Sequence, residues 1–326
     1  MIDQDTLYNK VNAYIEGLQY NAEPEGLYAP IKYILSLGGK RIRPILMLMA
    51  YNLYEEQVDG ILPNAVALET YHNFTLLHDD LMDKADMRRG NMTVHKKWDE
   101  NTAILSGDAM LIMAYRLFVK NAVSMPHLLD ALDTFNDATL GVCDGQQYDV
   151  DFESRMDVTT DEYMEMVRLK TSLLLACALK IGAQLAGACA EDADNLYKFG
   201  EKMGQAFQLQ DDLLDVYGDP AVFGKKIGGD ILCNKKTFML ITAYNMAGGD
   251  CKDELKVWIE KADFEPEAKI RAVTAIYDKI GIRDVCQNEI ERLFNESLEF
   301  LDKVNVDDEK KTGLRDFANK LLKRNK

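Results

Sequence analysis

Apolar residues recur along most of the chain every three or four positions, the spacing that places them on one face of an α-helix. Alternating runs typical of strands are nearly absent. Glycine and proline interrupt the helical pattern and divide it into long segments. The helices predicted in this way cover residues 27–37, 43–57, 64–86, 101–123, 127–151, 159–189, 191–217 and 235–248.

Several of these segments exceed the ordinary length of a helix in a globular protein. Long helices that are apolar over much of their circumference pack as bundles. We therefore predict an all-α bundle of long, mostly antiparallel helices around a central active-site cavity. No linker rich in glycine, serine or proline interrupts the sequence, so residues 1–326 are expected to form a single domain.

Two copies of Asp-Asp-Leu-X-Asp follow apolar helical segments, at residues 79–83 and 211–215. Residues three and four apart share a helix face, so each copy is a cluster of carboxylates. Mg²⁺ prefers such ligands and completes its shell with water and phosphate oxygens, so two clusters that face each other would bind a diphosphate. A solvated helix face is the alternative for either motif alone. The candidate metal ligands are Asp79, Asp80, Asp83, Asp211, Asp212 and Asp215.

The net charge of -16 argues against nucleic acid as a partner. Basic residues concentrate in short groups at residues 40–43, 88–89, 225–226 and 235–236, as is typical of anion sites in an acidic chain. The six cysteines lack metal-ligand spacing and are expected to be buried thiols in a reducing compartment. The acidic N-terminus and the absence of a run of about twenty apolar residues predict a cytoplasmic protein without a membrane span.

The segment Gly-Gly-Lys-Arg-Ile-Arg-Pro at residues 38–44 places three cations at a predicted helix start. Such a start offers N–H groups to an anion, and arginine clamps phosphate. Lys40, Arg43 and Arg89 are therefore candidates for a second diphosphate site that needs no metal, although an ordinary basic turn would look the same. His72 lies two turns before the first acidic motif and is a candidate phosphate contact.

Lys170 lies within an apolar predicted helix. A lysine in this setting often extends to the surface. The alternative is that Lys170, with Lys225 after the second acidic motif, neutralises the charge of a departing diphosphate.

With these motifs, the chain resembles the trans-isoprenyl diphosphate synthases, or polyprenyl synthetases, over nearly its whole length. The order and joint presence of the landmarks make the resemblance very specific. They are Gly-Gly-Lys-Arg-Ile-Arg-Pro at 38–44, His-Asp-Asp-Leu-Met-Asp through Arg-Arg-Gly at 78–90, Gly-Asp at 107–108, Lys-Thr at 170–171, Phe-Gln-Leu-Gln-Asp-Asp-Leu-Leu-Asp at 207–215 and Gly-Lys-Lys-Ile-Gly-Gly-Asp at 224–230.

The resemblance implies the isoprenoid synthase fold, a homodimer, and three Mg²⁺ ions held by the aspartates on the diphosphate of an allylic substrate. Loss of that diphosphate would leave an allylic cation, which the double bond of isopentenyl diphosphate attacks. Thr171 and Gln208 would present oxygens near the cation. The residues implied for the allylic diphosphate are Arg88, Lys170, Lys225 and Lys235, and those for isopentenyl diphosphate are Lys40, Arg43, His72 and Arg89.

Product length is expected to depend on Tyr71, Phe74 and Thr75, which precede the first acidic motif. By resemblance, two aromatic rings there imply a short product, geranylgeranyl diphosphate before farnesyl diphosphate, from a dimethylallyl, geranyl or farnesyl primer. Core packing is the alternative role for both rings. A terpene cyclase and a non-catalytic regulatory subunit are the rival functions. A cyclase normally carries one such acidic motif, and an idle subunit usually loses acidic positions.

Overall fold

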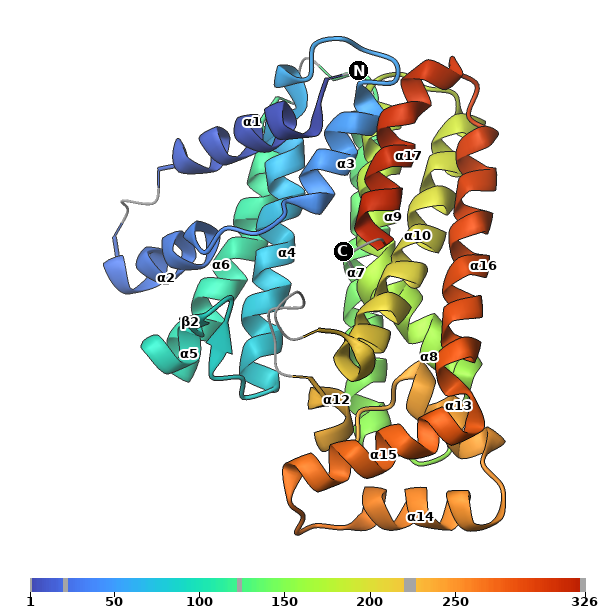
Figure 1. The fold of residues 1–326 in the computed structure, drawn as a ribbon. Helices are drawn as coiled ribbons and strands as arrows, with labels where there is room; N and C mark the ends of the chain where they lie inside the picture. The colour runs from blue at the N-terminus through green and yellow to red at the C-terminus, as the bar shows by residue number, and fades with distance from the viewer. Residues whose placement is uncertain (1, 20–22, 122–124, 220–226, 323–326) are drawn as a thin grey trace. The chain divides into compact units, whose positions relative to one another are not determined.

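The structure is a computed structural model that describes residues 2–19, 23–121, 125–219 and 227–322. These residues are mostly helical, and the strands among them form one short hairpin, so the all-α prediction is confirmed (Figure 1). The chain divides into two compact units, which are described separately. Unit 1 comprises residues 1–135, 178–194 and 305–314, and unit 2 comprises residues 136–177, 195–304 and 315–326. A single domain stays a prediction.

Unit 1 contains six α-helices of its own, one 3₁₀ turn and the hairpin, counted over its described residues. They are α1 Gln4–Glu16, α2 Glu25–Ser36, α3 Ile42–Tyr51, η1 Asp59–Ile61, α4 Leu62–Met82, β1 Met87–Arg88, β2 Asn91–Met92, α5 Val94–Lys97 and α6 Glu100–Phe118. The two antiparallel strands pair Met87 with Met92 and Arg88 with Asn91.

Helix α4 forms the core of unit 1 and packs along α6 (Figure 1). Pro63 suits its first turn, because proline fixes a helical φ where no N–H partner is needed. Every residue from Pro63 to Tyr71 is buried, so this part of the helix is enclosed on all sides. The helix was predicted to reach residue 86 and instead ends at Met82, because Lys84 adopts a left-handed conformation with φ 52° that stops it.

Four helices contribute residues to both units. They are α7 Leu128–Glu153, α9 Leu173–Leu185, α10 Ala190–Tyr217 and α17 Asp308–Leu322. The remaining described elements belong to unit 2 alone. They are α8 Thr160–Val167, the π-helical turn η3 Arg168–Ser172, α12 Gly229–Leu232, α13 Phe238–Met246, α14 Gly249–Glu260, α15 Pro266–Ile280 and α16 Ile282–Asp302.

The predicted helix over residues 159–189 is interrupted by this π-turn. Its start agrees with the sequence, because Thr159 and Glu162 form a capping box at the first turn of α8. The π-turn carries Lys170 and Thr171, and such turns inside α-helices often occur at functional sites. Gly145 of α7 lets the turn approach closely, since a Cβ there would lie 2.4 Å from the backbone nitrogen of Lys170.

The prediction of six buried thiols is wrong for half of them. Cys177, Cys251 and Cys286 are buried, whereas Cys143, Cys189 and Cys233 are exposed. All six are free thiols. Within the described residues, no helix combines the length and the apolar character needed to cross a bilayer.

Candidate active site

The first acidic cluster lies at the carboxyl end of α4 in unit 1, where the sequence predicts it. Asp79 and Asp80 occupy the last turn of the helix and Asp83 caps it. Their surroundings differ: Asp80 is only 3% exposed, Asp79 is half-buried, and Asp83 is exposed. The alternative of a solvated helix face is therefore wrong for the first two carboxylates, whereas Asp83 is exposed beyond the packed part of the helix.

Arg88, on β1, binds the buried carboxylate of this cluster. Its Nε lies 2.6 Å from Oδ2 of Asp80, and its second guanidinium nitrogen lies 2.7 Å from Oδ1. This two-bond geometry matches the planar guanidinium to the planar carboxylate. Burial raises the pKa of Asp80 above its ordinary value, and Arg88 opposes that rise. The hairpin therefore supplies a counter-charge that fixes the middle aspartate.

The three cations before α3 have different environments. Arg41, at the helix N-cap with φ 49°, is 4% exposed and donates to Glu69 at 2.8 Å and to the carbonyl oxygen of Leu35 at 2.8 Å. Its guanidinium is therefore a buried structural group. Lys40 is exposed, and Arg43 is half-buried.

Arg43, His72 and Arg89 lie near one another in unit 1, since the charge of Arg89 acts on both of the other side chains. Arg43 donates to Nε2 of His72 at 3.0 Å, and Arg89 donates to the carbonyl oxygen of Gly38. Gly39 must lack a side chain, because a Cβ there would lie 2.8 Å from the Arg89 guanidinium. Three residues predicted for the second diphosphate site are thus brought together.

The electrostatic environment leaves His72 neutral and the arginines of this group charged. Burial, followed by the charge of Arg43 and its arginine neighbours, lowers the pKa of His72 well below its ordinary value. The imidazole is therefore neutral near pH 7 and accepts the hydrogen bond from Arg43. Burial likewise lowers the pKa of Arg43 to about 10, which leaves the guanidinium charged. The available positive charge comes from the arginines and Lys40.

Aromatic side chains continue from the first cluster down α4. The ring of Phe74 packs edge-on against His78, with 4.8 Å between centroids, and against Tyr71 at 5.5 Å. Tyr71 in turn contacts Phe135 of α7 at 5.7 Å. Tyr71 is buried, whereas Phe74 and Thr75 are half-buried.

The Gly-Asp landmark on α6 has a structural explanation in this region. A Cβ at Gly107 would lie 2.2 Å from Nε2 of His78, so glycine makes room for that ring. His78 also lies within hydrogen-bond distance of the carbonyl oxygen of Ile104 at 3.2 Å. Gly107 thereby lets α6 pack directly against the residue that precedes the first acidic motif.

The second acidic cluster lies in the last two turns of α10, in unit 2. Asp212 is 4% exposed and accepts hydrogen bonds from the hydroxyl of Tyr163 and from Nε2 of Gln208, the latter at 3.0 Å. Burial, followed by the charge of Asp230, raises the pKa of Asp212 to about 7. Asp211 and Asp215 are half-buried.

The segment after the second cluster is attached to Asp215. The amide of Asp230 donates to Oδ2 of Asp215 at 3.0 Å, and the amide of Gly228 donates to its backbone oxygen at 2.6 Å. Gly228 has φ 85°, a conformation that glycine adopts without strain. The Gly-Gly-Asp landmark therefore folds back onto the acidic cluster.

Lys170 meets a carboxylate that the sequence did not single out. Its Nζ lies 2.6 Å from Oδ2 of Asp149 on α7. Although burial opposes the change, Lys235 and Lys170 lower the pKa of Asp149 below its ordinary value. Lys235 is exposed. Lys170 is therefore held in a charged pair and does not simply extend to the surface.

Gln208 connects the π-turn to the second cluster, because its Oε1 accepts from the hydroxyl of Thr171 at 3.1 Å while its amide donates to Asp212. Lys225 lies outside the described residues. Sequence reasoning missed Asp149 and Tyr163, which lie far from both motifs and carry no local signal. Asp230 was within a quoted landmark but received no role.

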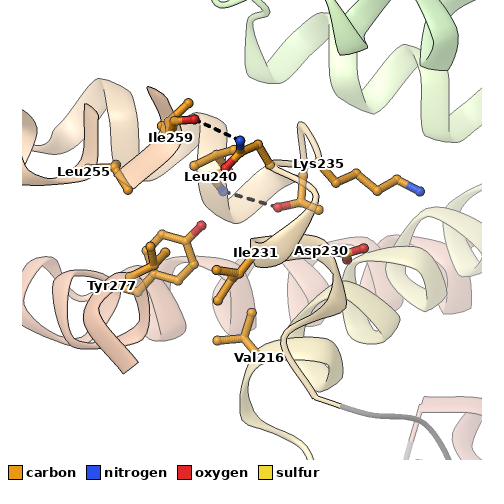
Figure 2. A pocket seen from close by; sticks show the side chains of 11 residues that line it. Val216, Asp230, Ile231, Lys235, Leu240, Leu255, Ile259 and Tyr277 are labelled. Atoms are coloured by element: carbon orange, nitrogen blue, oxygen red, sulfur yellow. Dashed lines mark hydrogen bonds between the residues drawn. The ribbon is translucent and has the colours of Figure 1, made fainter. Parts of the chain in front are cut away.

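A small enclosed cavity of about 10 Å³ lies beneath α12. Leu255, Ile259 and Tyr277 line its apolar side, and Figure 2 shows the Lys235 side chain extending away from them. The cavity is too small for a substrate, so it is a packing gap between α12 and the helices that line it.

The donor set fits Mg²⁺ that is shared with a ligand. Among the described residues, no three His, Cys, Asp or Glu side chains converge on a complete metal cage. Mg²⁺ rarely needs one, since it keeps several waters and binds through one or two carboxylates plus phosphate oxygens. Asp79 and Asp211, both half-buried, supply oxygens of the required chemistry.

An all-helical chain with two aspartate-rich helix ends and separate groups of cations defines a Mg²⁺-dependent enzyme class that acts on prenyl diphosphates. The model of the family described as polyprenyl synthetase matches residues 24–277, and the chain belongs to this family. It is a short-chain trans-prenyl diphosphate synthase, as the sequence predicts, and dependence on Mg²⁺ is general for the family.

Known relatives match most of the chain. A geranylgeranyl diphosphate synthase from Methanosarcina mazei is 38% identical and covers 96% of this chain and 94% of its own. A geranylfarnesyl diphosphate synthase from Natronomonas pharaonis is 35% identical, with 86% and 90% covered. A crystal structure of a geranylgeranyl pyrophosphate synthase has a TM-score of 0.94 and 42% identity, with both chains fully covered.

Proposed function

We propose that the protein condenses isopentenyl diphosphate with a dimethylallyl, geranyl or farnesyl diphosphate in head-to-tail 1'-4 fashion. The product is an all-trans prenyl diphosphate, geranylgeranyl diphosphate before farnesyl diphosphate, and diphosphate is released. The observation that carries this proposal is the same in each unit: one deeply buried aspartate held by side-chain donors, beside more accessible aspartates of the same motif. The names of the relatives support the substrate class.

Both acidic clusters are proposed to act on the allylic diphosphate, with three Mg²⁺ ions held by the six aspartates. When bound, Mg²⁺ supplies Lewis-acid stabilisation of the leaving group. Asp80 keeps its orientation through Arg88, and Asp212 keeps its own through Tyr163 and Gln208.

The allylic diphosphate gains negative charge as its bond to carbon breaks, so nearby cations favour that step. We assign this role to Arg88, Lys170, Lys225 and Lys235. Asp149 supports the assignment, because it pairs with Lys170 and also feels the charge of Lys235 within unit 2. The Thr171 hydroxyl and the Gln208 carbonyl present oxygen dipoles that would favour the positive allylic carbon.

Isopentenyl diphosphate is assigned to Lys40, Arg43, His72 and Arg89. The contact between Arg43 and His72 supports this assignment. It uses one terminal nitrogen of the Arg43 guanidinium, so the other N–H groups can bind a phosphate. The Nε atom of Arg43 is buried and has no hydrogen-bond partner among the described residues, which is an uncompensated donor that an anion would satisfy. His72 then acts by holding Arg43.

We assign control of product chain length to the aromatic rings of Phe74 and Tyr71, which precede the first acidic cluster on α4. Phe74 is half-buried and packed against Tyr71 and His78, so truncation would open space beside them. Phe74→Ala is expected to shift the product distribution by at least one isoprene unit toward longer chains, as measured by chromatography of dephosphorylated products. Phe294→Ala, a half-buried phenylalanine of α16, is the matched control and leaves the distribution unchanged. An unchanged distribution in Phe74→Ala would remove the ring from the chain-length account.

An assay of prenyl transfer tests the function directly. It combines the purified protein with Mg²⁺, labelled isopentenyl diphosphate and each allylic primer in turn. Elongated prenyl diphosphates are expected. A cyclised hydrocarbon made without isopentenyl diphosphate would instead identify a terpene cyclase. Absence of any product with all three primers would support the regulatory-subunit alternative.

A homodimer is part of the proposal. Helix α6 exposes Leu105, Ile112 and Val119, seven residues apart, at 60%, 61% and 41% exposure. Such a stripe on one helix face is typical of an interface. Light scattering of the wild type and of an Ile112→Glu variant tests it, with a monomer expected for the variant.

We also propose a cytoplasmic location, supported by six free thiols.

A further inference from the structure

Lys269, in the first turn of α15, is only 1% exposed. A buried lysine needs partners for its ammonium group. Its Nζ donates to the carbonyl oxygen of Leu232 at 3.3 Å and to Oδ1 of Asn234 at 2.7 Å, and it lies 4.2 Å from the centroid of the Phe264 ring. No carboxylate forms an ion pair with it in the described part of the chain. All of its partners are therefore neutral.

These partners belong to the turn that leads from α12 to Lys235. Leu232 is the last residue of α12, and Asn234 has a left-handed φ of 53°. The amide group of Asn234 donates to the carbonyl oxygen of Ile259 at 3.0 Å, so the same side chain also ties the turn to α14. The next backbone amide, that of Lys235, donates to the carbonyl oxygen of Asp230 at 2.9 Å. The Lys269 ammonium group thus fixes the turn through its bonds to Leu232 and Asn234.

The other end of α12 is also fixed. Its preceding residue, Gly228, bonds to Asp215, and a Cβ there would lie 2.6 Å from Ile270, the neighbour of Lys269 on α15. Helix α12 is only four residues long, so its own hydrogen bonds cannot fix its orientation. Contacts at both ends therefore define where its side chains lie.

We propose that Lys269 is a positioning residue for the allylic diphosphate, because it fixes the turn at residues 232–234 and thereby aims the ammonium group of Lys235. This inference rests on the proposed function. In Figure 2 the Lys235 side chain extends away from the apolar lining of the cavity, on the same side as Asp230. Lys235 also lowers the pKa of Asp149, the partner of Lys170, so its position bears on the charges of that whole region.

Lys269→Met removes the ammonium group and keeps a long apolar side chain. The Leu232 carbonyl and the Asn234 side chain then lose their donor, and the turn is free to adopt other arrangements. We expect KM for the allylic diphosphate to rise about tenfold, which corresponds to the loss of one charged hydrogen bond. KM for isopentenyl diphosphate should change less than twofold, because the contacts of Lys269 involve none of its assigned residues. The matched control is Lys279→Met, at an exposed lysine of the same helix, and both of its KM values should equal those of the wild type.

A double-variant cycle separates positioning from a general loss of stability. In a Lys235→Ala background, Lys269→Met should raise KM for the allylic diphosphate no further, because Lys269 acts through Lys235. An equal rise of both KM values, or an undiminished effect in the Lys235→Ala background, would overturn the proposal. If Lys269→Met does not fold, Asn234→Ala breaks the same contact from the turn and should give the same selective rise.

Calorimetric titration with inorganic diphosphate and Mg²⁺ gives a readout independent of turnover. Weaker binding by Lys269→Met, with normal binding by Lys279→Met, supports the positioning role even for a protein that shows no prenyl transfer. Equal affinity in both variants overturns it. A wild type that binds diphosphate but elongates no primer would contradict the proposed function alone.

Discussion

The two Asp-Asp-Leu-X-Asp motifs are nearly identical in sequence, yet their middle carboxylates are held differently. Asp80 receives two hydrogen bonds from a charged guanidinium, at 2.6 and 2.7 Å. Asp212 receives its bonds from a phenol and an amide, and no cationic side chain forms an ion pair with it within the described residues. Its pKa is accordingly raised to about 7. The buried carboxylate of the motif is therefore paired with a cationic side chain in unit 1 and held by neutral donors in unit 2.

Removal of an accessible aspartate from either motif should have the largest effect. Asp79→Ala and Asp211→Ala are each expected to lower kcat/KM by about 10³-fold or more, since each removes a proposed Mg²⁺ ligand that would stabilise charge in the transition state. Steady-state assays with saturating Mg²⁺ measure this. The double variant should be little slower than either single one, because residues that act as a unit are not additive.

The matched controls are exposed aspartates of each unit, Asp133→Ala on α7 and Asp253→Ala on α14, which should retain normal rates. Melting temperatures of all four variants should stay within a few degrees of the wild type. A normal rate in Asp79→Ala or Asp211→Ala would remove that aspartate from metal binding.

Removal of the donors that hold the middle carboxylates should have a smaller, unequal effect. Arg88→Leu leaves Asp80 buried without its counter-charge and should destabilise the Mg²⁺-free protein by about 2–3 kcal/mol, allowing for the partial exposure of Arg88. Tyr163→Phe removes one neutral donor from Asp212 and should cost about 1–2 kcal/mol. Urea unfolding without metal measures both.

Asp80→Asn should restore most of the stability that Arg88→Leu loses, because the amide needs no counter-charge. A larger loss in Tyr163→Phe than in Arg88→Leu would show that the two carboxylates are not held as differently as their partners indicate.

The sequence predicted those parts of the molecule that depend on local pattern. Helical spacing located α4 and α10, and both acidic motifs lie at the ends predicted for them. The end of α4 was misplaced because the left-handed conformation of Lys84 has no distinct signal in a residue other than glycine or asparagine.

Partners from distant segments were beyond such reasoning. Tyr163 and Asp149 contact the predicted site residues Asp212 and Lys170 across long separations in the sequence, and no local periodicity encodes those contacts. The neighbouring cations before α3 illustrate the same limit. In sequence, Arg41 and Arg43 look equivalent, but the left-handed cap turns Arg41 toward Glu69 in the core and leaves Arg43 beside His72.

The smallest expected effect concerns His72 in unit 1. Several arginines surround this side chain, whereas no cationic side chain among the described residues forms an ion pair with Asp212 in unit 2. Burial and nearby arginines hold the pKa of His72 well below the value of about 6.5 that it has when unfolded. As pH falls through 6.5, the unfolded chain gains a proton that the folded chain does not, so stability present above pH 6.5 is lost progressively toward acid. His72→Gln, which can still accept from Arg43, should flatten the fall in melting temperature between pH 7.5 and 5.5, whereas the exposed His127→Gln should leave it unchanged. Parallel curves for wild type and His72→Gln would mean that the arginines do not keep this imidazole neutral.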